Sequence, residues 1–257
     1  ISTDARFGVL SKSGADAKKM LATIINEKWL TANGVIGIWE AEKSGEDIKV
    51  QYQKGTEKFH FLRQQNEFTK GKPNKSLVDF VASKEESSQD YIGGFAVTTG
   101  IGIEKHLERF EKDYDDYSSI MLKALADRLA EGFAEFMHKK VRTETWGYQT
   151  KEDLSNEELI KEKYQGIRPA PGYPACPEHT EKETLFKLLG ANKMGIILTE
   201  SMAMQPGAAV SGFYFAHPDA AYFNVGKIGK DQVVDYAQRK NWSIEIAEKW
   251  LSPILNY

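Results

Sequence analysis

The stretch VIGIWEAEKSGEDIKVQYQKGTEKFHFL, residues 35–62, decides the fold class. Its first run is apolar, and side chains then alternate between apolar and polar, with Ile48 and Val50 marking a second strand and Phe59 and Phe61 a third. Alternation is typical of a strand with one buried face, and the short polar segments between the runs are typical of hairpin turns. The stretch therefore predicts an antiparallel meander.

Helices and further strands are predicted in clusters around this meander. Apolar residues at helical spacing predict helices at 16–30, 103–141 (two helices or one bent helix), 154–166, 183–190, 231–240 and 243–251. Further strands are expected at 90–100, 195–204, 208–216 and 221–228. Because the strands do not alternate strictly with helices, the predicted fold class is α+β with a largely antiparallel sheet.

Local patterns make these helices specific enough to test. Ser155 with Glu158, and Thr180 with Glu183, have the spacing of capping boxes at helix N-termini. The long helical segment is expected to bury one apolar stripe, made of Ile120, Met121, Ala124, Leu125, Leu129, Phe133 and Phe136.

Composition bounds the function. The 257 residues carry a net charge of -3 and a single cysteine, and 28% of them are charged. This balance argues against a nucleic-acid partner, and one cysteine indicates a reducing, cytoplasmic compartment. No secretory signal or membrane-length apolar run is present in the sequence. The chain begins at Ile1 rather than Met, which suggests a piece of a larger parent protein.

Several familiar chemistries fit poorly. The five histidines are scattered, so no metal site is expected. Cys176 lies near His179, but no protease signature surrounds this pair, and no catalytic residue is assigned. The segment TTGIGIEKH, 98–106, resembles a glycine-rich nucleotide loop, yet Lys105 occupies the third glycine position. A strand-to-helix turn that needs Gly100 and Gly102 for its backbone angles is the simpler interpretation.

The segment RPAPGYPACPEHTEK, 168–182, carries the clearest functional pattern. Proline holds itself and the preceding residue out of helix, so we expect a stiff, extended ribbon that offers backbone donors and acceptors. Gly172 would permit close approach, Tyr173 offers a ring or hydroxyl, and Arg168 offers a planar fork for a carboxylate or phosphate. These residues predict a pocket for a small ligand with an aromatic base and an anionic group. A rigid connector, whose arginine only forms a salt bridge, is the competing interpretation.

The same residues resemble a known family. The segments NEELIKEKYQGIRPAPGYPACPEHTEK (156–182), LTESMAMQPGAAVSGFYFAHPDAAYF (198–223) and DYSSIMLKALADRLAEGFAEFMHKKVR (116–142) are similar to the C-terminal activation domain of cobalamin-dependent methionine synthase. The similarity runs from about Lys18 to the C-terminus, and its most specific motif is R-x-x-x-G-Y at 168–173.

The resemblance implies a single C-shaped α+β domain over residues 1–257, with a central twisted antiparallel sheet, from the C-terminal part of a multidomain methyltransferase. It implies that the domain binds S-adenosylmethionine and presents the methyl group for reductive methylation of oxidised cobalamin, which a neighbouring domain holds. This reactivation supports methyl transfer from methyltetrahydrofolate to homocysteine. The implied partners are that cobalamin domain and an electron donor of the flavodoxin or methionine synthase reductase type; zinc would lie elsewhere in the parent enzyme.

The resemblance also implies a set of ligand-binding residues. Arg168 would pair with the methionine carboxylate, and the adenosine would lie against the loop that follows. Carboxylates lining the groove would favour the positive charges of the ligand. The full implied set is Arg168, Ala170, Gly172, Tyr173, Tyr222, Phe223, Glu131 and Glu162.

Two alternatives stay open at this point. Relatives begin the domain with a YIDW-like stretch whose aspartate contacts the ligand, and this chain has no such stretch; Asp4 is not a match. The chain could therefore be a docking module for the cobalamin domain and the flavoprotein, with little ligand binding of its own. The other alternative is a free-standing methyltransferase that uses the 98–102 loop for its nucleotide.

Overall fold

The computed structural model describes residues 3–53, 55–65, 71, 73–86 and 89–257, with side chains from residue 14 onward. The chain forms two compact units. The first comprises Ile1–Gly34, Val97–Phe136 and Asn192–Val210, and the second comprises Val35–Ala96, Met137–Ala191 and Ser211–Tyr257.

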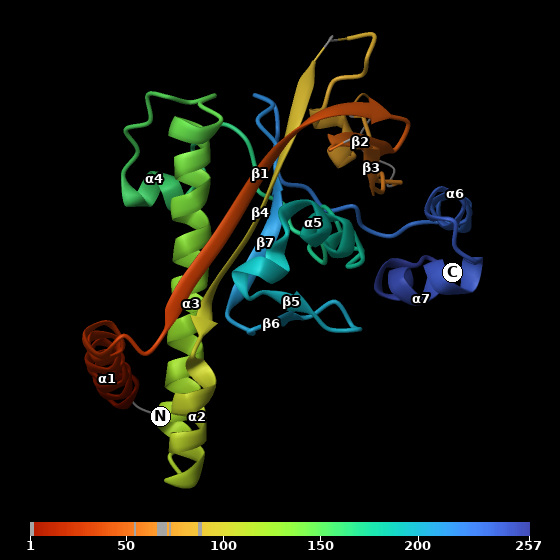
Figure 1. The fold of residues 1–257 in the computed structure, drawn as a ribbon. Helices are drawn as coiled ribbons and strands as arrows, with labels where there is room; N and C mark the ends of the chain where they lie inside the picture. Colours follow the sequence, from red (N-terminus) through yellow and green to blue (C-terminus); the bar gives the residue numbers. More distant parts are fainter. Residues whose placement is uncertain (1–2, 54, 66–70, 72, 87–88) are drawn as a thin grey trace. The chain divides into compact units, whose positions relative to one another are not determined.

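A five-stranded sheet has the order β3-β2-β1-β4-β7. Its strands are β1 (Thr31–Ser44), β2 (Asp47–Tyr52), β3 (Gly55–His60), β4 (Asp90–Ile101) and β7 (Ala209–Tyr214), and Figure 1 shows β1, β4 and β7 side by side. The predicted meander is confirmed. Both β1 with β2 and β2 with β3 pair antiparallel. Gly45 adopts a left-handed φ of 65° in the turn between β1 and β2, which glycine tolerates without steric cost.

Alternation in the meander corresponds to burial. Ile48, Val50 and Phe59 are fully buried, whereas Gln51 between the strand-forming apolar residues is exposed. The strands therefore have one face in the core. The described residues contain seven α-helices in addition to the sheet, so the α+β class is confirmed.

The first unit is mainly helical. It contains α1 (Thr3–Glu27), α2 (Ile103–Lys112) and most of α3 (Asp116–Lys140), with the short antiparallel pair β5 (Ile197–Leu198) and β6 (Met204–Gln205). The segment predicted as two helices or one bent helix is thus two helices. Their shared core consists of Ile24, Ile103, Phe110, Leu122, Ala126 and Ala208.

The buried face of α3 differs from the predicted stripe. Ile120 and Phe136 are 67% and 60% exposed. Alanine side chains are small enough for β4 to approach the helix closely. The Thr99 hydroxyl of β4 donates to the Ala126 carbonyl at 2.7 Å. The face that is buried has residues four apart, namely Leu122, Ala126, Ala130 and Ala134.

The second unit carries the remaining helices. They are α4 (Asn156–Ile160), α5 (Glu181–Leu189), α6 (Lys230–Lys240) and α7 (Ile244–Leu251), with a 3-10 turn at Leu77–Phe80 and a π-helical turn at Val141–Thr145. Near the C-terminus α6 and α7 lie together (Figure 1). The core between and around them is formed by Leu62, Val225, Ile228, Val233, Tyr236, Ala237, Ala247 and Leu251.

One predicted strand is wrong. Residues 221–228 contain no named strand. Their backbone groups bond to three separate segments instead: Asn224 O accepts from Gln64 at 2.8 Å, and Val225 N donates to Pro174 O at 2.9 Å. Ile228 N donates to the carbonyl of residue 254 at 2.9 Å. A segment whose partners are scattered cannot form a ladder.

Only one of the two predicted capping boxes forms. Ser155 and Glu158 exchange the two expected bonds, at 3.1 and 3.4 Å. At α5, however, the Thr180 hydroxyl donates to the Glu178 carboxylate at 2.7 Å and makes no bond to the helix backbone. Glu178 is 2% exposed, and a carboxylate that is so deeply buried requires donors.

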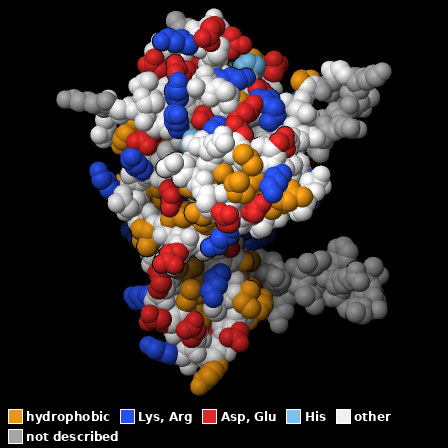
Figure 2. Space-filling model, turned by 90° about the vertical axis from the view of Figure 1, so that its right-hand side faces the viewer, with side chains coloured by type: hydrophobic (Ala, Val, Ile, Leu, Met, Phe, Trp, Pro, Cys, Tyr) orange, Lys and Arg blue, Asp and Glu red, His pale blue; other side chains and the backbone are white. Residues whose placement is uncertain are grey.

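The surface carries charged side chains of both signs (Figure 2). Figure 2 shows acidic and basic side chains interspersed over the visible face. None of the helices in the described part of the chain is long and apolar enough to cross a membrane.

Candidate functional site

The proline-rich segment is held against the end of β7. Ile167 and Phe215 bond each other's backbone at 3.0 Å in both directions, and Phe213 N donates to Pro169 O at 2.8 Å. The segment then turns on itself. Gly172 N donates to Cys176 O at 2.7 Å, and residue 173 bonds residues 170 and 176. The expectation of an extended ribbon with open backbone groups is therefore wrong in part: three of its amides bond within the loop.

Gly172 is required by a neighbouring ring. Its φ is 96°, and a Cβ at this position would lie 2.1 Å from Cε1 of His179. Side chains other than hydrogen would collide there. The close approach that the sequence predicted at Gly172 is thus made by His179 of the same loop.

The two aromatic residues of the predicted pair have different surroundings. Tyr222 is 41% exposed, and its hydroxyl accepts from the backbone amide of Arg168 at 3.0 Å. Phe223 packs against the core between α6 and α7, with its ring 6.4 Å from that of Phe80. Tyr173, in the loop, is 66% exposed. Tyr222 therefore offers a surface ring at the backbone of Arg168 and Tyr173 offers one within the loop, whereas Phe223 supports the core.

The Arg168 side chain is half-buried, and its Nη1 is anchored by two neighbours. Its Nη1 donates to the Tyr164 hydroxyl at 2.8 Å and lies 3.2 Å from Nδ1 of His138. The amino group of Nη1 has two hydrogens, and these two contacts use both of them. The guanidinium is thus fixed by residues outside the proline loop.

His138 is fully buried at the C-terminal end of α3. Its ring stacks on Tyr214 at 5.1 Å between centroids and meets Tyr164 edge-on at 5.0 Å. Burial, with the positive charges of Arg142 and Arg168, lowers the pKa of His138 to about 2. The imidazole is therefore neutral at physiological pH.

A second arginine supports this cluster by packing on the face of the Tyr164 ring. Arg142 lies in the π-helical turn with its guanidinium carbon 3.8 Å from the Tyr164 centroid. Glu152 pairs with it in a bidentate ion pair of 2.6 and 2.9 Å, and both side chains are fully buried. A buried pair with two parallel hydrogen bonds has a fixed geometry, so it also fixes the tyrosine.

The two predicted carboxylates lie in different units. Glu131 belongs to the first unit, where it is exposed and pairs with Arg128 at 2.5 Å. Glu162 belongs to the second unit, where it is exposed and has a φ of 53° just after α4. The structure thus brings together the loop residues, Arg168 and Tyr222. It also adds His138 and Tyr164, which the sequence did not predict as site residues.

Cys176 does not have the environment of a nucleophile. It is buried, and burial together with the carboxylates of Glu181 and Glu178 raises the pKa of the thiol well above its usual range. A catalytic cysteine requires a lowered pKa because the thiolate is the reactive form. Among the described residues, no group of three or more His, Cys, Asp and Glu could hold a metal ion.

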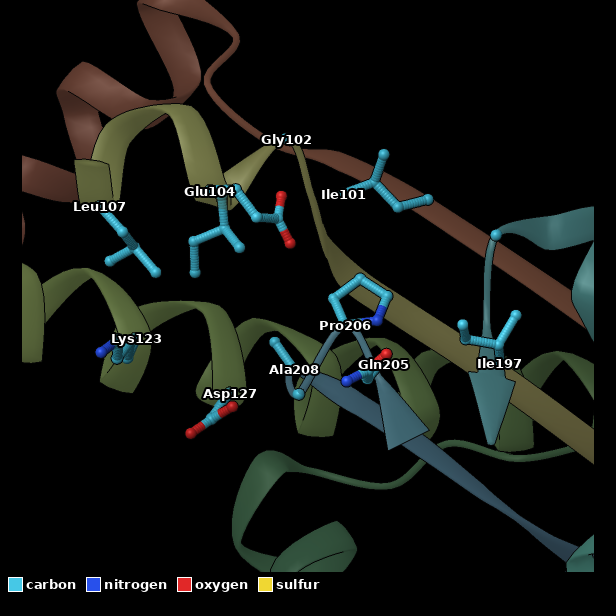
Figure 3. A pocket seen from close by; sticks show the side chains of 13 residues that line it. Ile101, Gly102, Glu104, Leu107, Lys123, Asp127, Ile197, Gln205, Pro206 and Ala208 are labelled. Carbon is cyan, nitrogen blue, oxygen red and sulfur yellow. The ribbon is translucent and has the colours of Figure 1, made fainter. Parts of the chain in front are cut away.

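A cavity of about 850 Å³ in the first unit lies at the turn between β4 and α2. Figure 3 shows Pro206 and Ala208 facing Glu104, Lys123 and Asp127, and the lining is otherwise mainly apolar. This is the turn that resembles a nucleotide loop.

The local structure requires glycine at both positions of that turn. A Cβ on Gly100 would lie 2.8 Å from Cβ of Pro206, and Gly102 has a φ of 93° immediately before α2. Packing and backbone conformation therefore explain these glycines without a phosphate. The geometry favours the arginine loop over the glycine turn as the candidate ligand site.

Fold and site together define an α+β module whose proline-rich loop begins with an anchored arginine and carries an exposed tyrosine, with a second exposed tyrosine bonded to the arginine backbone. The chain matches the family model described as "Vitamin B12 dependent methionine synthase, activation domain" over residues 7–241. It belongs to this family of activation domains.

A solved relative supports the assignment. The crystal structure of the MetH reactivation domain bound to AdoHcy is 51% identical in sequence and has a TM-score of 0.91. The match covers 96% of this chain and 78% of that chain. At this identity the relative is evidence for both fold and family.

Proposed function

We propose that this chain binds S-adenosylmethionine at the 168–173 loop, with Arg168 pairing to the methionine carboxylate. The observation that carries the proposal is the anchored guanidinium: its Nη1 is held at 2.8 Å by Tyr164 and at 3.2 Å by His138. An arginine that is ordered before binding loses less side-chain entropy when a carboxylate arrives. The 51% identical relative bound to AdoHcy supports the same ligand class.

The other residues would hold the rest of the ligand. Gly172, Tyr173 and the backbone of Ala170 would contact the adenosine, together with Tyr222. Phe223 would act through packing, because its ring already lies in the core. Glu162, which lies in the same unit as the loop, would contribute negative charge towards the sulfonium and ammonium groups.

The proposed role in the reaction is positioning. The methyl group leaves a sulfonium, so the departing thioether is neutral and needs no general acid. The parent enzyme's cobalamin, when bound and reduced, supplies the nucleophile that accepts this methyl group. What this chain's residues contribute is a fixed orientation of the donor, through the carboxylate at Arg168 and the base at the loop.

The wider setting follows from the family. We propose that residues 1–257 are the activation domain of a longer cobalamin-dependent methyltransferase that works in the cytoplasm. Its partners would be the cobalamin domain of that enzyme and a flavodoxin- or reductase-type electron donor. The single, buried cysteine is in keeping with a reducing compartment.

Isothermal titration with S-adenosylmethionine tests the proposal. We expect saturable one-to-one binding that Arg168→Ala weakens tenfold or more, since a hydrogen bond to a charged group contributes about 1.5 to 3 kcal/mol. Arg109→Ala is the matched control, because Arg109 is exposed on α2 in the first unit. Equal affinities for wild type and Arg168→Ala would refute the role of Arg168. Absence of binding by the wild type would leave the docking role.

A further inference from the structure

We propose that His138 and Tyr164 are positioning residues that select for the carboxylate of the ligand by holding Arg168. The inference rests on the proposed function and goes beyond it, because neither residue belongs to the predicted ligand-binding set. Both contact one guanidinium nitrogen of Arg168.

The protonation state of His138 follows from its two neighbours. Arginine can only donate, so Nδ1, which faces Arg168 at 3.2 Å, must be the acceptor. The ring proton then lies on Nε2, which faces the Tyr148 hydroxyl at 3.4 Å. Stacking on Tyr214 fixes the plane of the ring. His138 thus offers a lone pair at a fixed point rather than a second positive charge.

Tyr164 is fixed independently. Its hydroxyl accepts from Arg168 at 2.8 Å, while its ring face lies against Arg142. Arg142 is held by the fully buried Glu152. The two acceptors for Nη1 of Arg168 therefore come from two supports, one on α3 and one beyond the π-helical turn.

Two acceptors at fixed points restrict a long side chain to one rotamer. Ordering such a side chain at binding costs about 0.5 to 1.5 kcal/mol, which corresponds to about two- to twelvefold in affinity. The benefit applies only to a ligand group that Arg168 contacts. Loss of either acceptor should therefore weaken binding of a ligand with a carboxylate and leave a ligand without it unaffected.

The test is a titration of the whole chain with S-adenosylmethionine and with its decarboxylated form. His138→Asn and His138→Leu are a matched pair of similar size, and only asparagine places an acceptor near the position of Nδ1. Tyr164→Phe removes one oxygen and keeps the ring against Arg142. We expect His138→Leu and Tyr164→Phe to lose about two- to twelvefold affinity for S-adenosylmethionine only, and His138→Asn to retain that affinity.

Three results would overturn the inference: unchanged affinity in both His138→Leu and Tyr164→Phe, equal losses for the two ligands, or no rescue by His138→Asn. Thermal unfolding checks that each variant is folded. If His138→Leu does not fold, Tyr164→Phe decides the question by the same comparison. A failure of the proposed function looks different, because the wild type would then bind neither ligand or would not distinguish them.

Discussion

Arg142 and Glu152 form a bidentate ion pair in which both side chains are fully buried. Removing one partner of such a pair leaves an uncompensated charge in the interior, which typically costs about 3 to 5 kcal/mol. We therefore expect Glu152→Gln to lower the free energy of unfolding by about that amount, measured by urea denaturation.

The control for this prediction is the exposed pair Lys140 with Glu144, at 3.1 Å. Pairs of this kind contribute about 0 to 1 kcal/mol, so Glu144→Gln should be nearly neutral. A Glu152→Gln variant as stable as Glu144→Gln would contradict the account of the buried pair.

His138 predicts a pH dependence of stability. The folded chain keeps it neutral with a pKa of about 2, whereas the unfolded chain takes up a proton below about pH 6.5. The stability from this residue is complete above pH 6.5 and falls by about 1.4 kcal/mol per unit as the pH drops from there towards 2.

Unfolding free energies at pH 7 and pH 5 measure this effect. We expect a loss of about 2 kcal/mol in the wild type, and a much smaller loss in His138→Asn. The pKa values of His106 and His179 are also lowered, but both residues are present in both proteins. The pKa of Asp79 is lowered to about 2, so the stability that it provides is lost only below about pH 3.8, outside the range measured. Parallel pH profiles for wild type and variant would be the contradicting result.

Gly172→Ala should be destabilising through His179. The new Cβ would lie 2.1 Å from the His179 ring, at a φ of 96°. Removing the ring with His179→Ala should relieve the collision and leave only backbone strain, about 1 to 2 kcal/mol. A double-mutant cycle by thermal or urea unfolding measures this coupling.

Gly132→Ala is the matched control for that cycle. Gly132 lies within α3, and no described atom beyond the helix's own backbone stands within 4 Å of the point where a Cβ would lie. Alanine there should raise stability by about 1 kcal/mol. If Gly172→Ala is as harmless as Gly132→Ala, the close packing of His179 on the loop does not exist in solution.

The buried face of α3 predicts opposite outcomes for two nearby residues. Leu122 is fully buried, so Leu122→Ala should cost about 2 to 5 kcal/mol. Ile120 is 67% exposed, so Ile120→Ala should change stability by no more than about 0.5 kcal/mol. Urea denaturation of both variants checks this. A larger loss of stability for Ile120→Ala would mean that the apolar stripe predicted from the sequence is the buried face.

This contrast explains what could be predicted from the sequence. The meander was predictable because Ile48, Val50 and Phe59 alternate with polar residues, and alternation directly reflects a face in the core. The buried face of α3 was not predictable in this way. Large apolar side chains such as Ile120 and Phe136 suggested one face, whereas the face that is buried consists mostly of alanines, which allow close packing.

The residues of the candidate site were also predictable only in part. The proline loop was predictable, since its residues are contiguous. His138 and Arg142 were not, because their partners Arg168, Tyr164 and Glu152 meet them only in the folded chain. A signal did exist: every fourth residue from Leu122 to Ala134 is buried, and the next two positions of that series are His138 and Arg142. Polar residues that continue a buried stripe indicate a buried polar cluster.

A crystal structure of this chain with S-adenosylhomocysteine tests the binding role of Arg168 most directly. We expect a carboxylate oxygen of the ligand about 2.7 to 2.9 Å from the guanidinium of Arg168, with the adenine against the 170–173 loop. A ligand in the cavity beside Gly102 and Pro206, with Arg168 contacting no ligand atom, would contradict it.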